Sequence, residues 1–252
     1  MGKKSRNGNG HENGYSYGDE YNVGTLLKDI VPNTQTYSYT QRKVKIKHRS
    51  RKQQEFTDVI EDNQITLCNG PAGCGKSYLS IIKSLELIQR DGNKYKKIFI
   101  ITPTVEATKN SVGFLPGDFT SKVSLFMNSV YRLFDKIIGK EYCDKLIKEG
   151  LIEVLGIGYI RGENLDNCVL IVEEAQNISK KEMLTILTRI GENCKMIISG
   201  DLLQIDNFKN VEDSGLYHAM KKLEGVDEIS VFVFTNDDIV RNTIISKILE
   251  KY

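Results

Sequence analysis

The chain has 252 residues, of which 40% are hydrophobic and 27% charged, as in ordinary soluble globular proteins. Its 35 Lys and Arg and 33 Asp and Glu leave a net charge of +2, which excludes a polycation that holds nucleic acid through bulk charge alone. No apolar run approaches the roughly 18 residues of a membrane span, and no apolar segment follows the charged start as in a secretory signal. We therefore expect a cytoplasmic protein with no membrane partner.

The first 40 residues differ from the rest of the chain. They are rich in Gly, Asn and Tyr and poor in aliphatic side chains. Such a segment buries too little apolar surface to offset the entropy lost on ordering. We predict a disordered extension at 1–40 and one folded domain at 41–252.

A basic run lies at the start of the expected domain. Residues 42–52 hold seven Lys and Arg and no acid. Two interpretations stay open: a solvated shoulder of the domain, which composition alone favours, and a contact for phosphate backbones.

From about residue 60, short apolar runs alternate with segments of helical period. This alternation is typical of βαβ units around a parallel sheet. The expected strands are Ile65–Cys68, Ile98–Ile101, Cys168–Val172, Met196–Ile198 and Ile229–Phe234. The expected helices carry apolar stripes over 78–88, over 183–190 with Gly191 as the residue after the helix end, and over 239–249 with Asn236 as N-cap. The fold class is therefore α/β, with helices on both faces of a mainly parallel sheet.

The five cysteines are scattered, without a Cys-x-x-Cys pair. This pattern favours reduced thiols in a cytosolic compartment over a disulfide framework or a zinc site. Cys68 and Cys168 lie in apolar runs and are expected to be small core residues.

Residues 70–77 match the phosphate-binding pattern G-x-x-x-x-G-K-[ST], between an expected strand and an expected helix. Its glycines permit a tight turn that directs backbone N–H groups at a phosphate. Lys76 would reach the β- and γ-phosphates, and the Ser77 hydroxyl would bind Mg²⁺. The predicted ATP-binding residues are Gly70, Pro71, Ala72, Gly73, Cys74, Gly75, Lys76 and Ser77.

Hydrolysis also requires a carboxylate that orients the metal and a group that activates water. Glu173 and Glu174 end a buried strand, where open α/β sheets bind their ligands. We assign Glu173 to the metal and Glu174 to the attacking water.

Two later segments add candidates for contact with the γ-phosphate. The strand before Ser199-Gly200-Asp201 is followed by Gln204, a candidate neutral sensor of the γ-phosphate or its water. Arg241, near the start of the last expected helix, could stabilise transition-state charge.

Together these blocks resemble the PhoH family of P-loop ATPases, relatives of the superfamily 1 helicase core. The resemblance covers about residues 45–252 and rests on many blocks in family order. They are Gly70–Ser77, Thr102–Ala107, Gly113–Asp118, Ile160–Gly162, Glu173–Asn177, Leu187–Gly191, Gly200–Asp206, Asp213–Leu216 and Asp238–Arg241.

The resemblance implies a three-layer, RecA-like P-loop fold, with ATP and Mg²⁺ as ligands and ATP hydrolysis as the activity. It implies RNA or single-stranded DNA as partner, and Thr102-Pro103-Thr104 looks like the helicase segment that touches a nucleic-acid strand. It also implies adenine recognition by Gln53 and a homo-oligomer, with a hexameric ring as the form in which Arg161 or Arg189 would act in trans. The catalytic residues it implies are Lys76, Glu174, Gln204 and Arg241.

The sequence departs from the family pattern at Glu173, where the usual residue is Asp. The extra methylene moves the carboxylate by about a bond length, enough to affect metal geometry. An alternative function is therefore a nucleotide-gated binding or assembly module that hydrolyses weakly. A third, a small-metabolite kinase, would need a lid and an acceptor pocket that the sequence does not indicate.

Overall fold

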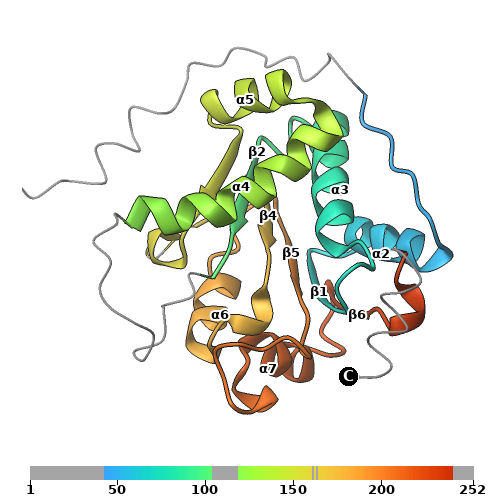
Figure 1. Cartoon of the computed structure of the whole chain (residues 1–252), viewed down its shortest axis with the longest axis vertical. Helices are drawn as coiled ribbons and strands as arrows, with labels where there is room; N and C mark the ends of the chain where they lie inside the picture. The colour runs from blue at the N-terminus through green and yellow to red at the C-terminus, as the bar shows by residue number, and fades with distance from the viewer. Residues whose placement is uncertain (1–42, 104–118, 161, 163, 241–252) are drawn as a thin grey trace, which may run out of the picture. The chain divides into compact units, whose positions relative to one another are not determined.

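The computed structural model describes residues 43–103, 119–160, 162 and 164–240. Their centre is a six-stranded sheet with the strand order β3-β2-β4-β5-β1-β6 (Figure 1). Every neighbouring pair is parallel. The strands are β1 (Ile65–Asn69), β2 (Lys97–Ile101), β3 (Ile152–Leu155), β4 (Cys168–Val172), β5 (Cys194–Gly200) and β6 (Ile229–Val233). The predicted α/β class with a parallel sheet is confirmed, as are all five expected strands.

Helices cover both faces of the sheet (Figure 1). One face carries α2 (Arg51–Asp62), α3 (Lys76–Arg90), α4 (Phe119–Ile138) and α5 (Lys140–Lys148). The other carries α6 (Lys180–Leu187) and α7 (Gly215–Lys222). Four 3₁₀ turns complete the described elements: η1 (Ile157–Ile160), η2 (Ala175–Asn177), η3 (Val211–Asp213) and η4 (Asn236–Asp238). No helix in these described ranges is long and apolar enough to cross a membrane.

Two hydrophobic cores form because alternate residues of each strand face opposite sides. In β4, Val169 and Ile171 enter the core under α3, whereas Leu170 and Val172 enter the core under α6 and α7. All five residues of β4 are buried, as in a strand covered on both faces. Burial of each such aliphatic side chain stabilises the folded state by about 1.5–3 kcal/mol. The continuous apolar runs therefore lie at the centre of the sheet.

Two predicted helix ends are wrong. The helix over 183–190 ends at Leu187, and Gly191 is not its left-handed cap, because an isolated parallel bridge pairs Ile190 with Leu165. A Cβ at Gly191 would lie 1.9 Å from Asp166 Oδ1, so close approach of another segment accounts for the glycine. Asn236 lies inside η4, and Thr235 makes the capping box with Asp238 instead. The helix expected over 239–249 and the extension at 1–40 lie outside the described residues.

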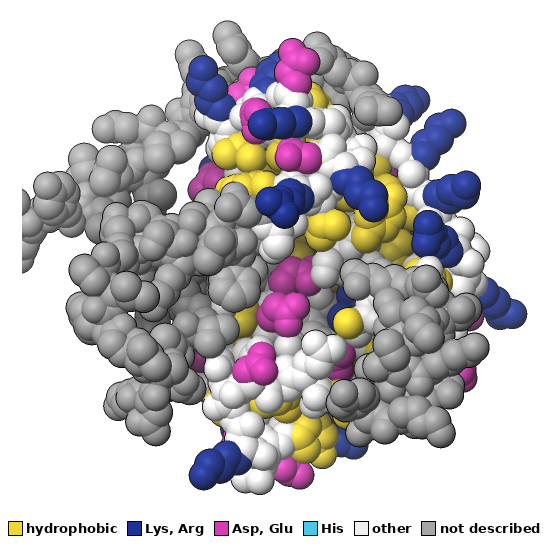
Figure 2. All heavy atoms as spheres, in the orientation of Figure 1, with side chains coloured by type: hydrophobic (Ala, Val, Ile, Leu, Met, Phe, Trp, Pro, Cys, Tyr) yellow, Lys and Arg dark blue, Asp and Glu magenta, His cyan; other side chains and the backbone are white. Residues whose placement is uncertain are grey.

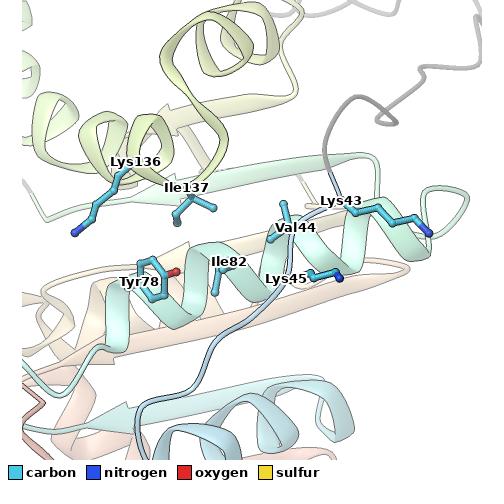
Figure 3. A pocket seen from close by; sticks show the side chains of 7 residues that line it. All are labelled: Lys43, Val44, Lys45, Tyr78, Ile82, Lys136 and Ile137. Atoms are coloured by element: carbon cyan, nitrogen blue, oxygen red, sulfur yellow. The ribbon is translucent and has the colours of Figure 1, made fainter.

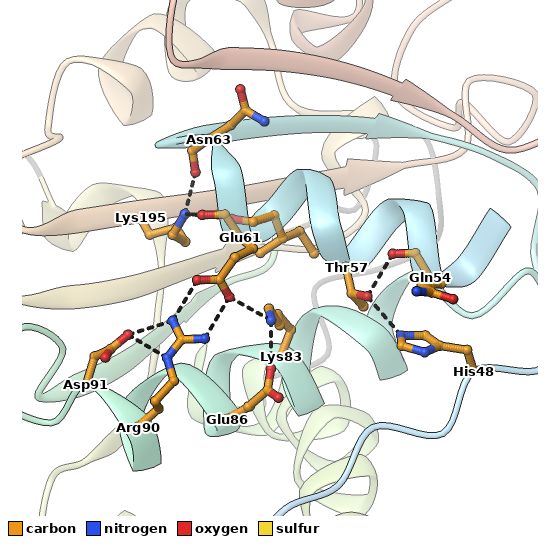
Figure 4. Close-up of polar contacts among 11 residues, drawn as sticks. His48, Gln54, Thr57, Glu61, Asn63, Lys83, Glu86, Arg90, Asp91 and Lys195 are labelled. Atoms are coloured by element: carbon orange, nitrogen blue, oxygen red, sulfur yellow. Dashed lines mark hydrogen bonds and ion pairs between the residues drawn. The ribbon is translucent and has the colours of Figure 1, made fainter. Parts of the chain in front are cut away.

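Helix α2 is joined to α3 by a network of ion pairs (Figure 4). Glu61 accepts hydrogen bonds from Arg90 at 2.6 and 3.1 Å and pairs with Lys83 at 2.7 Å. These cations, Arg90 above all, lower the pKa of Glu61 to about 2. The end of α2 is held separately by the Lys195 ammonium, which donates to the carbonyls of Ile60 and Glu61 at 2.6 and 3.0 Å. The network fixes α2 on α3, the helix that follows the phosphate-binding loop.

We expect Glu61→Gln to lower the free energy of unfolding at pH 7 by about 1–2 kcal/mol. The effect is no larger because the network is partly exposed and solvent screens its charges. A carboxylate whose pKa is lower in the folded than in the unfolded protein stabilises the fold at any pH above its unfolded pKa of 4.5. This stabilisation is lost as the pH falls toward the folded pKa of about 2. Urea unfolding of the wild type and of Glu61→Gln should therefore show that the difference between their free energies of unfolding becomes smaller below pH 4.5. Glu55→Gln, which removes exposed pairs with Arg51 and Lys52, is the matched control and should cost less than about 0.5 kcal/mol. A difference that stays constant down to acid pH would contradict this role of Glu61.

Candidate nucleotide-binding site

The carboxyl ends of three central strands meet at one edge of the sheet. Asn69 of β1 pairs with Gly200 of β5, and Val172 of β4 pairs with Ile198. The phosphate-binding loop leaves β1 at this edge, where Gly70 N donates to Gly200 O at 3.1 Å. The parallel register therefore places residues 70–77, 173–174 and 201–204 together, as the sequence predicted.

The loop has the backbone geometry that a phosphate cradle requires. Gly73 and Gly75 have φ values of 96° and 101°, which glycine adopts without steric cost. Gly75 precedes the first residue of α3 and makes no side-chain cap, so the first N–H groups of the helix keep their capacity to bind an anion. The Lys76 ammonium donates to Gly70 O and Pro71 O at 2.6 and 3.0 Å. A positive charge and helix N–H groups thus converge on one loop.

Ser77 and Glu173 are in direct contact across the site. Ser77 Oγ donates to Glu173 Oε2 at 2.5 Å, although the two residues come from α3 and the end of β4. Glu173 is 7% exposed, and burial raises the pKa of its carboxyl to about 7. The longer side chain at this position therefore reaches the hydroxyl without an intervening water.

The same pair fits a magnesium ion. The second Glu173 oxygen, Oε1, is buried and makes no hydrogen bond of standard geometry within the described residues, although the Ser199 hydroxyl is near enough to lower the pKa of the carboxyl. A hydroxyl and a carboxylate oxygen are the hard ligands that Mg²⁺ takes, the remaining positions being filled by phosphate and water. The described part of the chain holds no group of three His, Cys, Asp or Glu placed to bind a metal without such help.

Glu174 differs from its neighbour in exposure and in backbone geometry. Its side chain is exposed. Its backbone is in the left-handed region, with φ 52° and ψ 35°, a conformation that costs a non-glycine residue about 1–2 kcal/mol. Gln176 Nε2 donates to Glu174 Oε2 at 2.7 Å and fixes the direction of the carboxylate. One acid of the pair is thus buried against Ser77, and the other faces solvent.

Asp201 connects the loop to Gln204, a role that its sequence position alone did not indicate. Its Oδ2 accepts from Ala72 N at 3.2 Å and from Gln204 Nε2 at 2.7 Å. Gln176 closes the network, because its Oε1 accepts from Asp201 N at 3.1 Å while its Nε2 donates to Gln204 O at 3.1 Å and to Glu174. Both residues fall in the blocks that carry the family resemblance, which was the available signal. The network makes the position of Gln204 depend on the loop.

Gln53 lies against the phosphate-binding loop from the side of α2. Its Nε2 donates to Cys74 O at 2.9 Å, and its Oε1 accepts from Arg49 N at 2.8 Å. It is buried, whereas the adjacent Gln54 is exposed, so the structure distinguishes the two. Both amide atoms serve the protein itself, and adenine recognition by Gln53 stays a prediction.

A cavity of about 290 Å³ opens beside the acid pair. It is lined by Thr102 and Pro103 at the end of β2, by Ile81 of α3, and by Val130 and Leu133 of α4, together with Glu173 and Glu174. The segment with a helicase-like pattern therefore borders the site through its first two residues. Its continuation over 104–107 and the block over 113–118 lie outside the described residues.

Of the three candidate arginines, Arg189 alone lies among the described residues, and it is not at this edge. Arg189 O accepts from Leu165 N, three residues before β4, so Arg189 lies at the amino edge of the sheet. A five-residue strand separates the two edges by about 16 Å, and Arg189 is therefore remote from its own chain's loop. Arg161 and Arg241 lie outside the described residues, although Val240 N donates to Gly73 O at 3.3 Å. The role of each arginine stays a prediction.

All five cysteines are free and buried. Cys68 and Cys168 are core residues, as expected, and Cys74 lies inside the phosphate-binding loop.

We expect the metal-free protein to lose stability as Glu173 ionises. The pKa of Glu173 is about 7 in the folded protein and 4.5 in the unfolded chain, so the folded state holds the proton more tightly. The resulting contribution to the free energy of unfolding is greatest below pH 4.5 and is lost as the pH rises through 7. In EDTA, the free energy of unfolding should fall by about 2 kcal/mol between acid and alkaline pH relative to Glu173→Gln, which cannot titrate. The exposed Glu192→Gln should follow the wild-type profile. Parallel profiles for wild type and Glu173→Gln would contradict the raised pKa.

Comparison with known proteins is consistent with this geometry. The family described as PhoH-like protein matches residues 45–252. PhoH-like proteins of Bacillus subtilis and Mycobacterium tuberculosis are 37% and 33% identical over 82% and 93% of this chain. Protein PhoH of Escherichia coli K12 is 32% identical over 81% of it. The chain covers 64%, 63% and 57% of these three proteins, respectively.

Among solved structures, the large terminase of a thermophilic bacteriophage aligns with 82% of this chain and 51% of its own. The TM-score is 0.48 and the sequence identity 11%. The family match extends over most of the chain, including the phosphate-binding loop, the acid pair and the Asp201 network. The chain belongs to the PhoH-like protein family.

Proposed function

We propose that the protein hydrolyses ATP to ADP and phosphate with Mg²⁺ and couples this reaction to the binding of RNA or single-stranded DNA. The observation that carries the proposal is the Ser77–Glu173 contact with its second carboxylate oxygen, buried and without a hydrogen bond of standard geometry, beside an exposed Glu174. This pairing of a metal-holding carboxylate with a second, solvent-facing acid suits phosphoryl transfer to water.

Each residue has a distinct part in the proposed reaction. Lys76 exchanges its carbonyl partners in the loop for phosphate oxygens and neutralises their charge. Ser77 and Glu173 hold the metal, which when bound supplies further neutralisation of phosphate charge. Glu174, oriented by Gln176, accepts a hydrogen bond from the attacking water.

Gln204 is proposed to sense the γ-phosphate. Its side-chain amide donates to Asp201, which also accepts from Ala72 N of the loop. A shift of the loop on binding phosphate would therefore reach Gln204 through one shared carboxylate. Arg241 is proposed as a further stabilising charge. Its neighbour Val240 is bonded to Gly73.

Nucleic-acid coupling and assembly belong to the same proposal. The family resemblance supports a single-stranded partner, and the cavity beside Glu174 is bordered by Thr102 and Pro103, which the resemblance assigns to strand contact. A homo-oligomer is proposed because the family resemblance suggests rings, in which Arg189, remote from its own loop, could act on a neighbouring copy. The domain at 41–252 is the proposed functional unit.

The alternative is a nucleotide-gated binding or assembly module with weak hydrolysis. It is favoured by one observation: the longer side chain of Glu173 contacts Ser77 directly, which changes the position of the carboxylate relative to the metal that the pair would hold. Glu173→Asp discriminates between the two functions. A large gain in turnover on this substitution would favour the module, whereas an unchanged or reduced rate would favour an ATPase adapted to Glu.

We expect Lys76→Ala and Glu174→Gln each to lower the rate of ATP turnover by about 100-fold or more, because each removes a charge or base needed in the transition state. Phosphate release should be measured with and without oligo(U) RNA and oligo(dT). Lys222→Ala and Glu192→Gln, exposed and remote from the loop, are the matched controls and should turn over at the wild-type rate. Equal rates in all five proteins would refute the site assignment. Rates that neither oligonucleotide raises would refute the coupling.

A further inference from the structure

Residues 43–49, which we call the basic strap, cross the outer side of α3 with a strict alternation of exposure. Val44 and Ile46 are partly buried against the core under α3 and α4. Lys43, Lys45 and Lys47 are exposed on the opposite side. Figure 3 shows the strap passing over α3, with Val44 turned toward Ile82 and Ile137. The basic run is therefore an ordered, two-sided segment.

Contacts along its length fix the strap in place. Val44 N donates to Gln89 Oε1 at 2.9 Å, and His48 Nε2 lies 2.8 Å from Thr57 Oγ1 (Figure 4). With the backbone held at both ends, alternate lysines in an extended segment stand about 6–7 Å apart. The strap is thus a row of cations at a regular spacing.

The charge of this row is not balanced by nearby acids. Within the described residues, no carboxylate pairs with Lys43, Lys45 or Lys47, whereas Lys52 and Lys83 both have carboxylate partners. Lys136 of α4 adds a fourth cation across a depression of about 220 Å³. Figure 2 shows Lys and Arg side chains in a column along the side where Figure 1 draws this segment.

We propose that the basic strap binds the phosphate backbone of a single-stranded nucleic acid, an inference that rests on the proposed function and gives it a surface. Three cations in a row suit a polymer with repeated charges, whereas a small anion needs groups that converge. Tyr78 is partly exposed in the same depression, and an aromatic ring among cations is typical of single-strand sites because bases stack on it.

A lipid surface fits the strap less well. Binding at a membrane surface combines basic residues with exposed large apolar side chains that enter the lipid. In the described ranges these exposed apolar residues are Leu184, Leu203, Val226 and Val233. None of them lies on the strap or on α3.

Two chains of hydrogen bonds connect Arg49, the last residue of the strap, to the phosphate-binding loop. Arg49 N donates to Gln53 Oε1, and Gln53 Nε2 donates to Cys74 O. The Arg49 guanidinium donates to Val240 O at 3.1 Å, and Val240 N donates to Gly73 O. Hydrogen bonds thus connect the strap to Cys74 and Gly73, two residues of the predicted ATP-binding loop.

The test uses the full chain with Lys43, Lys45 and Lys47 all changed to Gln. The matched control changes Lys209, Lys221 and Lys222 to Gln, which removes the same charge from exposed positions elsewhere. Binding of labelled oligo(U) and oligo(dT) is measured by fluorescence anisotropy between about 50 and 300 mM salt. Each phosphate contact on a single strand contributes about 0.7 to the slope of log K against log salt. ATP turnover is measured on the same samples, without and with oligonucleotide.

The strap variant should bind about 10- to 100-fold more weakly at low salt, with a slope smaller by about 2, and should keep its basal turnover but lose stimulation. The control should match the wild type in all three measurements. Wild-type affinity and slope in the strap variant would overturn the strap while leaving the proposed function intact. A wild type that binds neither oligonucleotide would overturn both, as would strap-dependent binding to vesicles of anionic lipid without any binding to oligonucleotide.

Discussion

The bond between Ser77 and Glu173 is the contact on which the site depends. It joins the first turn of α3 to the end of β4, although β5 lies between β4 and the strand that leads into α3. A charged side chain taken out of water is costly unless it is paired, and here the pairing is incomplete, since one carboxylate oxygen makes no hydrogen bond of standard geometry within the described residues. The protein thus keeps a buried acid at some expense in stability. A cation bound there would supply the missing partner.

Parallel strand pairing makes this arrangement possible. Because every strand ends at the same edge, short segments after β1, β4 and β5 meet, although β4 ends 103 residues and β5 131 residues after β1. Asp201 then joins two of these segments by accepting from both Ala72 and Gln204. The Glu61 network and the Gln53 contacts hold α2 against α3 and the loop from the other side. Stability and function share the same few contacts near the loop.

Much of the fold follows from local sequence. Runs such as Cys168–Val172 are buried on both faces, so each must be continuously apolar, and a continuous run is visible without a structure. β3 has only four residues and carries Glu153 paired with Lys97, so its apolar signal is interrupted. The sequence failed to indicate β3, whereas at Gly191 it indicated a helix cap that is not there. A glycine required by the close approach of Asp166 looks the same in sequence as a glycine that caps a helix.

The site could be predicted as a set of residues but not as a set of contacts. The pattern at 70–77 and the pair at 173–174 carry their chemistry in residue type and spacing. The sequence did not indicate that Glu173 is buried and Glu174 exposed, because this depends on the left-handed backbone at Glu174. Nor did composition decide the basic run, one side of which is partly buried because it packs on the core under α3 and α4. Tertiary contacts decide both.

The most direct test of the central claim is the thermal stability of the protein with ADP, in Mg²⁺ and in EDTA. A ligand that binds only the folded state stabilises it by RT ln(1 + [L]/Kd), so at a fixed concentration tighter binding raises the melting temperature further. The account predicts a larger rise with ADP and Mg²⁺ than with ADP and EDTA, and it predicts that Glu173→Gln abolishes this difference. An equal rise in the two conditions for the wild type, or a magnesium effect that survives in Glu173→Gln, would contradict it.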